Sequence, residues 1–330
     1  MLKVAIISRW HVHAGQYYNQ FKERADVQVT CMYDEDAVEG KKFADERGLP
    51  FETCLDTLLA RPDVDAVCID SPTNEHHEVL IKCAKAGKHI FTEKVLAPTV
   101  AEANDIIKAI KDAGVKFCIS YPHRGMPHNL YAKKVVSEGL LGQITYMRVR
   151  NAHNGATANW LPARFYCPVQ CCGGAMMDLG AHPMYLIAWL MGKPVEIASA
   201  FTNVTEGKEV EDNAVSVMKF ADGAIAVSET GFVTSNSPFT LEVHGTAGSL
   251  TIVGNEVKLA SAKLNEASAS HLGSIKVERL GRPLADPVNM FVDGVLNDKE
   301  IVYGLDDALM LTEIMDAAYR AHKDGGFVKV

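Results

Sequence analysis

Three consecutive carboxylates, Asp34-Glu35-Asp36, follow the apolar run 27–33. That run has the composition of a buried strand, and open parallel α/β sheets bind ligands where their strands end. A carboxylate after the second strand of such a sheet can accept both ribose hydroxyls of a dinucleotide. The acidic neighbours would repel a ribose 2′-phosphate, so the pattern favours NAD over NADP. An acidic start of a surface loop is the other interpretation of Asp34.

The turn after the first apolar run, 4–7, lacks the glycines of a dinucleotide-binding loop. A G-x-G-x-x-G motif would place glycines where this chain has Ser8, Trp10 and His13. We still expect the loop to receive a pyrophosphate at the start of the following helix, with fewer close backbone contacts. Trp10 is too large to lie beneath the phosphates, so we expect it to turn outward, over the cofactor or toward the substrate. Packing between domains is the alternative.

Asp178 and His182 are four residues apart, which would place both on one face of a helix. Pro183 follows directly, and a proline inside a helix removes a hydrogen bond. Either the helix kinks over 179–183, or it begins near His182 with the pair in a turn.

Up to residue 121, short apolar segments alternate with segments of helical pattern. The alternation predicts right-handed crossovers and a Rossmann-type parallel sheet. We expect strands at 4–7, 27–33, 51, 66–70, 89–92 and 116–120, and helices at 13–23, 39–47, 55–60, 76–86 and 100–113.

Beyond residue 121, strand patterns follow one another with few helices between them, which predicts an α+β domain with a large, mostly antiparallel sheet. The expected strands are 144–151, 196–204, 213–220, 224–230, 240–244 and 249–253; only 126–138, 184–191 and 306–323 have a helical pattern. We therefore predict two domains, a nucleotide-binding domain at 1–121 and a substrate-binding and oligomerisation domain at 122–330.

The composition excludes several classes of protein. The formal net charge is −8, which disfavours nucleic acid as a partner. No apolar run reaches the roughly 18 residues of a membrane span, and the apolar start is too short for a secretory signal, so we expect no membrane partner and a cytoplasmic location. The eight cysteines are scattered, as expected of free thiols. Cys167, Cys171 and Cys172 with His182 match no compact zinc-binding spacing, so we predict no metal site.

The run from Asp65 to Thr99 combines several motifs in a fixed order. They are Ser71-Pro72-Thr73 with His76, then Ala86-Gly87-Lys88-His89, then Glu93-Lys94. Later segments add GLLGQI at 139–144, Gly173-Gly174 with Asp178, Gly180 and His182, and GTAGSL at 245–250. Together they resemble the Gfo/Idh/MocA family of glucose–fructose oxidoreductase, inositol dehydrogenase and their relatives, over most of the chain.

The resemblance implies an NAD-dependent enzyme that transfers a hydride between nicotinamide and a hydroxyl-bearing carbon of a sugar, sugar derivative or cyclitol. Its catalytic residues would be Lys94, Asp178 and His182. His182 would take the hydroxyl proton, Lys94 would stabilise developing alkoxide charge, and Asp178 would orient the imidazole or bind a neighbouring hydroxyl. The cofactor would contact Ser8, Trp10, His11, Asp34, Ser71, Pro72, Thr73, His76, Glu93 and Lys94, and the polyhydroxylated substrate would contact Arg124, Trp160, Arg164 and Tyr166. Where the family has a proline, this chain has Val95, so we expect a trans peptide there.

Two other functions remain open. One is a glycosidase or lyase that retains NAD and oxidises its sugar only transiently. The other is a non-catalytic, nucleotide-responsive binding protein, which the glycine-free loop favours and the Lys94, Asp178 and His182 set disfavours. By family analogy we expect a homo-oligomer, a dimer or a tetramer.

Overall fold

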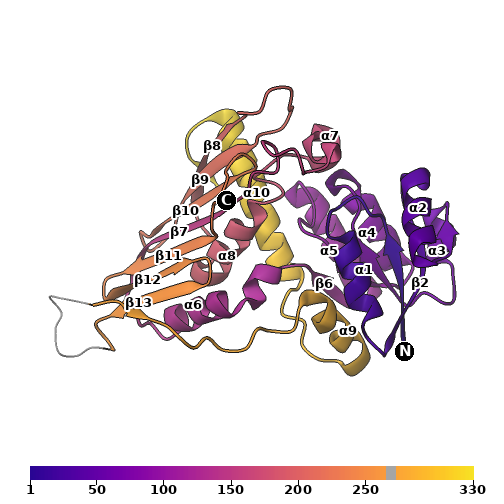
Figure 1. Cartoon of the computed structure of the whole chain (residues 1–330), viewed down its shortest axis with the longest axis horizontal. Coiled ribbons are helices and arrows are strands. Elements are labelled where there is room, and N and C mark those ends of the chain that lie inside the picture. Colours follow the sequence, from indigo (N-terminus) through magenta and orange to yellow (C-terminus); the bar gives the residue numbers. More distant parts are fainter. Residues whose placement is uncertain (265–272) are drawn as a thin grey trace. The chain divides into compact units, whose positions relative to one another are not determined.

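The computed structural model describes residues 1–264 and 273–330. They form two compact units, whose residues can be followed in Figure 1 by the colours of the sequence. The first comprises Met1–Tyr121 and Ala285–Thr312, and the second comprises Pro122–Leu284 and Glu313–Val330. The last change of unit falls inside one helix, α10 (Leu305–Asp324).

The first unit is built on a six-stranded sheet whose paired strands are all parallel, as predicted for a Rossmann-type domain. Its strands, in spatial order, are β3 (Phe51–Glu52), β2 (Val27–Tyr33), β1 (Leu2–Ile7), β4 (Ala66–Ile69), β5 (His89–Thr92) and β6 (Phe117–Ile119). The connecting helices are α1 (Ala14–Lys22), α2 (Ala37–Arg47), α3 (Leu55–Leu59), α4 (His76–Lys85) and α5 (Val100–Ala113). Every residue of β4 is buried, as expected of a strand covered on both faces.

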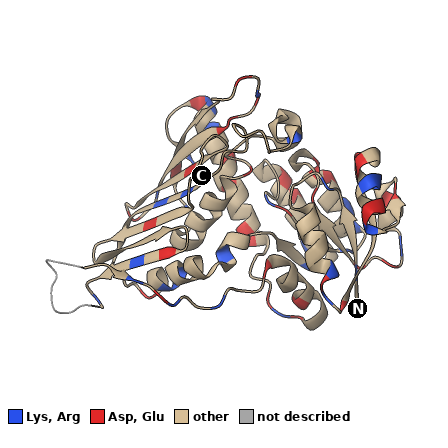
Figure 2. Cartoon of the chain, viewed as in Figure 1, with Lys and Arg blue, Asp and Glu red and all other residues tan. Residues whose placement is uncertain are grey.

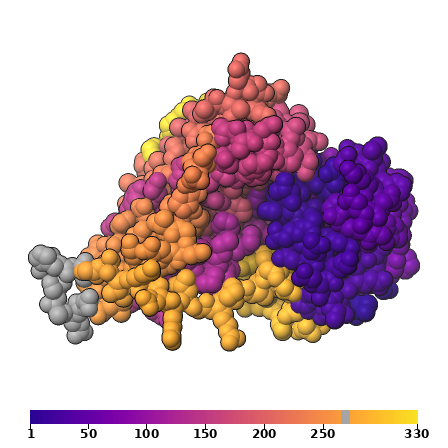
Figure 3. Space-filling model, viewed as in Figure 1, coloured from indigo at the N-terminus to yellow at the C-terminus, as the bar shows by residue number. Residues whose placement is uncertain are grey.

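A helix that we did not predict, α9 (Pro287–Asn297), completes the first unit. The Phe291 ring lies 6.4 Å from the Phe21 ring and 5.9 Å from the Phe91 ring. In the space-filling view, this yellow-orange segment adjoins the indigo N-terminal residues (Figure 3). We expected the first domain to end at residue 121, but residues 285–312 also belong to the first unit. They do so because the apolar face of α9 packs on α1 and β5.

The second unit contains a nine-stranded sheet that is antiparallel apart from the pairing of β7 with β10, which confirms the predicted α+β architecture. Its spatial order is β14 (Ile275–Lys276), β13 (Glu256–Ser261), β12 (Gly248–Val253), β11 (Thr240–Gly245), β7 (Ile144–Ala152), β10 (Ile225–Gly231), β9 (Asn213–Lys219), β8 (Glu196–Thr202) and β15 (Val328–Lys329). β13, β14 and β15 were not predicted.

Helices lie on one face of this sheet (Figure 1). They are α6 (Pro127–Ser137), α8 (Ala181–Met191) and the last turns of α10, while α7 (Pro168–Cys171) lies in the connection before α8. Acidic and basic residues are interspersed along both units (Figure 2). In the described part of the chain, no helix combines the length and the apolar character needed to cross a bilayer.

Candidate active site

Asp34 lies buried at the carboxyl end of β2, as the sequence pattern predicted. Its Oδ2 accepts the Arg9 amide at 2.9 Å and its Oδ1 accepts the Asp36 amide at 2.8 Å. Burial raises the pKa of this carboxyl, and the two amides oppose that rise. Sequence reasoning missed Gly40 of α2, where an added Cβ would lie 2.1 Å from the Asp34 Cβ. The helix therefore approaches Asp34 as closely as it does only because residue 40 is glycine.

Glu35 and Ser8 form a second contact at this edge of the sheet. The Ser8 hydroxyl donates to Glu35 Oε1 at 3.0 Å, whereas Oε2 is buried with no hydrogen-bond partner among the described residues. Burial and the neighbouring Asp34 charge raise the pKa of Glu35 to about 7. Ser8 has a φ of 68°, in the left-handed region that favours glycine. Ser8 thus adopts a left-handed backbone conformation at the position where a G-x-G-x-x-G motif would have its first glycine.

The rest of the β1–α1 loop satisfies much of its own hydrogen bonding. The Ser8, Trp10 and His11 amides donate to Tyr33, to the Ser8 hydroxyl and to Asp70, respectively. The Arg9 guanidinium binds Glu39 at 2.9 Å. Trp10 is only 8% exposed, so the rest of the chain covers most of its side chain. Three amides of the loop are therefore already bonded within the protein.

The loop after β4 carries the Ser71-Pro72-Thr73 motif. Thr73 begins a short 3₁₀ helix, Thr73–Glu75, and the buried Ser71 Oγ has no partner among the described residues. His76, the first residue of α4, has Nδ1 2.7 Å from the Val95 carbonyl oxygen and Nε2 3.1 Å from the Ser71 carbonyl oxygen. Burial lowers the pKa of His76. Its imidazole thereby joins the turn after β4 to the turn after β5.

Glu93 and Lys94 follow β5 and are both buried. The Lys94 Nζ lies 3.7 Å from Glu93 Oε1, while Glu93 Oε2 accepts the Tyr17 hydroxyl and lies 3.1 Å from His13 Nδ1. The Lys94–Val95 peptide is cis, so the expected trans peptide was wrong. Sequence reasoning also missed Tyr17 and the contact of His13, because neither belongs to a motif that pairs it with residue 93.

This edge of the sheet fits a dinucleotide. Asp34 follows β2 at the edge where such sheets bind ligands, and Glu35 Oε2 and Ser71 Oγ are buried polar atoms that a ligand could satisfy. The loop before α1 provides a helix start for phosphate, although many of its amides are already bonded.

In the second unit, His182 occupies the first turn of α8, which begins at Ala181. The Asp178–His182 pair therefore lies across a turn and a helix start, not on one helical face. Pro183 is accommodated because the first amides of a helix have no intrahelical partner. His182 is buried, with Nδ1 2.9 Å from the Tyr185 hydroxyl, and its ring stacks on His123 with the ring centroids 4.4 Å apart.

The Tyr185 hydroxyl joins the two histidines, since it also accepts the His123 amide at 3.2 Å. His123 and Tyr185 were not predicted, although Tyr185 stands three residues after His182, a spacing that brings side chains together on a helix.

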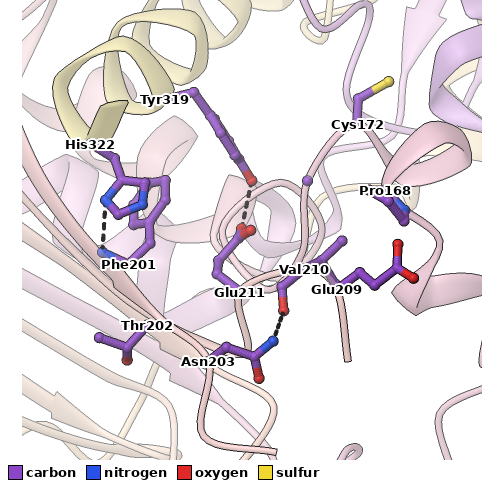
Figure 4. A pocket seen from close by; sticks show the side chains of 11 residues that line it. Pro168, Cys172, Phe201, Thr202, Asn203, Glu209, Val210, Glu211, Tyr319 and His322 are labelled. Carbon is purple, nitrogen blue, oxygen red and sulfur yellow. Dashed lines mark hydrogen bonds between the residues drawn. The ribbon is translucent and has the colours of Figure 1, made fainter. Parts of the chain in front are cut away.

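Asp178 lies in the segment that precedes α8, and Glu211 holds that segment. The Glu211 Oε1 accepts the Gly174 amide at 2.9 Å, the Met176 amide at 3.1 Å and the Tyr319 hydroxyl at 2.6 Å. An added Cβ at Gly173 would lie 2.1 Å from the Tyr319 hydroxyl oxygen, which explains the glycine there. Gly173, Glu211 and Tyr319 line a cavity of about 430 Å³, in which Figure 4 shows the Tyr319–Glu211 bond. Sequence reasoning missed Glu211 and Tyr319.

The four expected substrate residues lie in two segments of the second unit. Arg124 is buried over the Trp189 ring at 5.0 Å. Trp160 is 53% exposed and donates to the Asn154 side chain at 3.1 Å. Arg164 and Tyr166 lie in a 3₁₀ helix, Ala163–Tyr166, and the buried Tyr166 hydroxyl has no partner among the described residues. All eight cysteines are free thiols.

Comparison with known proteins identifies the family. Residues 5–121 match the model "Oxidoreductase family, NAD-binding Rossmann fold", and residues 129–251 match the model of the GFO/IDH/MocA C-terminal domain. A 1,5-anhydro-D-fructose reductase of Ensifer adhaerens is 29% identical over 68% of this chain and 67% of its own length. An inositol 2-dehydrogenase of Rhizobium meliloti is 24% identical over 90% of each chain. For a levoglucosan dehydrogenase of Pseudarthrobacter phenanthrenivorans, the match spans 56% of that protein's length.

Solved structures show the same fold. A levoglucosan dehydrogenase in complex with NADH and levoglucosan superimposes with a TM-score of 0.84, at 20% identity, over 100% of this chain and 99% of that one. The two family models and the sequence motifs indicate the same family. The chain belongs to the GFO/IDH/MocA family and is an oxidoreductase with an NAD-binding Rossmann domain.

Proposed function

We propose that this protein is an NAD-dependent dehydrogenase that acts on a hydroxyl-bearing carbon of a sugar, sugar derivative or cyclitol. The observation that carries the proposal is the burial of Lys94 directly after β5, at the edge where the sheet of an NAD-binding domain binds its ligand. The relatives support the substrate class, because they act on an anhydro sugar and on inositol.

When bound, NAD would supply the hydride acceptor, and the side chains of the chain would handle the proton. The Lys94 ammonium would hold the reacting oxygen and stabilise its developing negative charge. His182 would take the hydroxyl proton, with its ring fixed between His123 and Tyr185. Asp178 would bind a neighbouring hydroxyl or orient the histidine.

The test is a screen for NADH formation across sugars, cyclitols and glycosides, repeated with Lys94→Ala and His182→Ala on each active substrate. Each variant should lower kcat by about 10²–10⁴-fold and leave the NAD affinity within a few-fold. Near-normal kcat in either variant would reject the role of that residue. Substrate conversion without net NADH would instead support the glycosidase or lyase that retains its cofactor.

We also propose that the protein is a homo-oligomer. The helices of the second unit cover one face of its sheet, and the other face carries half-buried residues such as Val215, Val217 and Val227. A second copy of the chain could cover this face. Light scattering after size-exclusion chromatography should give the mass of a dimer or tetramer; the mass of one chain would exclude the proposal.

A further inference from the structure

Two histidines and a carboxylate converge at the carboxyl edge of the first sheet. His11 and His13 belong to the β1–α1 loop, and Glu93 follows β5. Their ligand atoms all lie within 4.8 Å of one another, which is true of no other three histidine, cysteine or acidic residues in the described ranges. His11 and Glu93 are buried, whereas the His13 side chain is 33% exposed. The group is therefore largely enclosed, with one side open to solvent.

The distances match those of a coordination sphere. Glu93 Oε2 lies 3.1 Å from His13 Nδ1 and 3.7 Å from His11 Nδ1. Ligand atoms about 2.1 Å from a tetrahedral zinc ion are about 3.4 Å from one another, a value between these two distances. The His11 Nδ1 accepts the His13 amide at 3.3 Å, so a metal ion that binds this nitrogen would have to displace that hydrogen bond.

The neighbouring groups resemble the outer partners of a metal site. The Tyr17 hydroxyl donates to Glu93 Oε2 and shares a 2.7 Å hydrogen bond with the Ser120 hydroxyl. Hydrogen bonds of this kind orient metal-binding carboxylates. Lys94 approaches the other carboxylate oxygen, Oε1, at 3.7 Å. The ammonium and a metal ion would therefore use different oxygens of Glu93.

The local charge also favours a cation. Ile69 pairs with Thr92 across β4 and β5, so the next residues, Asp70 and Glu93, lie side by side. Asp70 is fully buried, and its Oδ1 has no hydrogen-bond partner among the described residues. Glu93 is a buried carboxylate with Lys94 beside its Oε1, and a metal ion at Oε2 would add to the compensation of its charge.

We propose that His11, His13 and Glu93 bind a divalent transition-metal ion, for which Zn²⁺ is the best match to two imidazoles and a carboxylate. Three protein ligands leave a fourth position for water or a ligand oxygen. We expected no metal from the cysteine spacings, and no sequence motif joins His13 to Glu93, 80 positions later. The proposal does not depend on the dehydrogenase activity proposed above.

Metal binding can be measured on the full chain, stripped with a chelator and free of NAD and substrate. Titration with Co²⁺ should give one saturable site per chain with the visible absorption of tetrahedral cobalt, and Zn²⁺ should displace it. His13→Gln and Glu93→Gln should each weaken Zn²⁺ binding by more than about 100-fold, and Tyr17→Phe by about 10–100-fold. His77→Gln is the matched control, because His77 forms an exposed pair with Asp105 on α4 and α5 of the same unit. It should bind Zn²⁺ like the wild type.

Three results would overturn the proposal. One is wild-type protein without saturable Co²⁺ binding; the second is a cobalt spectrum dominated by thiolate charge transfer, which would assign the ion to cysteines. The third is equal Zn²⁺ affinity in His13→Gln and His77→Gln. Circular dichroism establishes that each variant is folded. The wild-type cobalt spectrum tests the proposed site without the use of any variant. Absence of dehydrogenase activity would refute the proposed function and leave this result unaffected.

Discussion

Glu35 makes the stability of the protein depend on pH near neutrality. Burial and the Asp34 charge raise the pKa of its carboxyl from 4.5 to about 7 in the folded protein. A raised pKa means that the folded state holds the proton more tightly than the unfolded chain does. The resulting stability is fully present below pH 4.5, falls as the pH rises toward 7, and stays constant above that, when both states are ionised.

The magnitude follows from the pKa difference. One pH unit corresponds to about 1.4 kcal/mol, so the change from 4.5 to about 7 is worth at most about 3.5 kcal/mol. Glu35 is only partly buried, which reduces this value through solvent screening. Between pH 5 and pH 8 we expect a loss of about 1–2 kcal/mol from this group.

The assay is urea unfolding of the wild type and Glu35→Gln at half-unit steps from pH 5 to pH 8. Glutamine keeps the acceptor for the Ser8 hydroxyl and does not ionise, so the variant should lack this part of the loss. Glu23→Gln, at an exposed carboxylate of the same unit, is the control whose curve should follow the wild type. Parallel curves for the wild type and Glu35→Gln would show that Glu35 is ionised throughout, and the reasoning from burial would fail.

Three further outcomes are expected. Calorimetry should show tighter binding of NAD than of NADP, and Asp34→Ser should reduce that difference; a preference for NADP in the wild type would reject the role of Asp34. Gly40→Ala should destabilise the protein by about 1–3 kcal/mol and weaken NAD binding, because its Cβ would collide with Asp34; unchanged affinity would mean that α2 can shift freely. NAD should quench a tryptophan signal that Trp10→Phe removes, with Trp160 and Trp189 as background; an undiminished quench in the variant would place Trp10 away from the cofactor.

The sequence was informative where a pattern is local. Alternating apolar strands and helices predicted the parallel sheet almost residue by residue, and β2, β5 and α5 have the predicted limits. It was uninformative where a contact joins distant positions. The helix α9 is stabilised by Phe21 and Phe91, which lie about 200 or more positions away from Phe291, and no pattern near residue 291 reports them.

The candidate site shows the same division. Motifs located Asp34, Lys94 and His182, each next to the end or start of an element. They could not locate Glu211, whose carboxylate holds the Gly173-Gly174 segment from a strand connection more than 30 positions later. A residue of this kind acts through backbone hydrogen bonds to another segment, so its type alone carries no signal.

The glycine-free loop shows why a missing motif does not imply a missing shape. Glycine is favoured at position 8 because the left-handed conformation costs other residues about 1–2 kcal/mol. Here Ser8 adopts it with a φ of 68°, while its amide donates to Tyr33 at 2.7 Å and its hydroxyl binds both Glu35 and the Trp10 amide. Glycine could not make the two hydroxyl contacts, and net hydrogen bonds of about 1 kcal/mol each offset the conformational cost. Ser8 thus holds this loop by its side-chain contacts as well as by its backbone turn, and the same loop carries the two histidines that lie near Glu93.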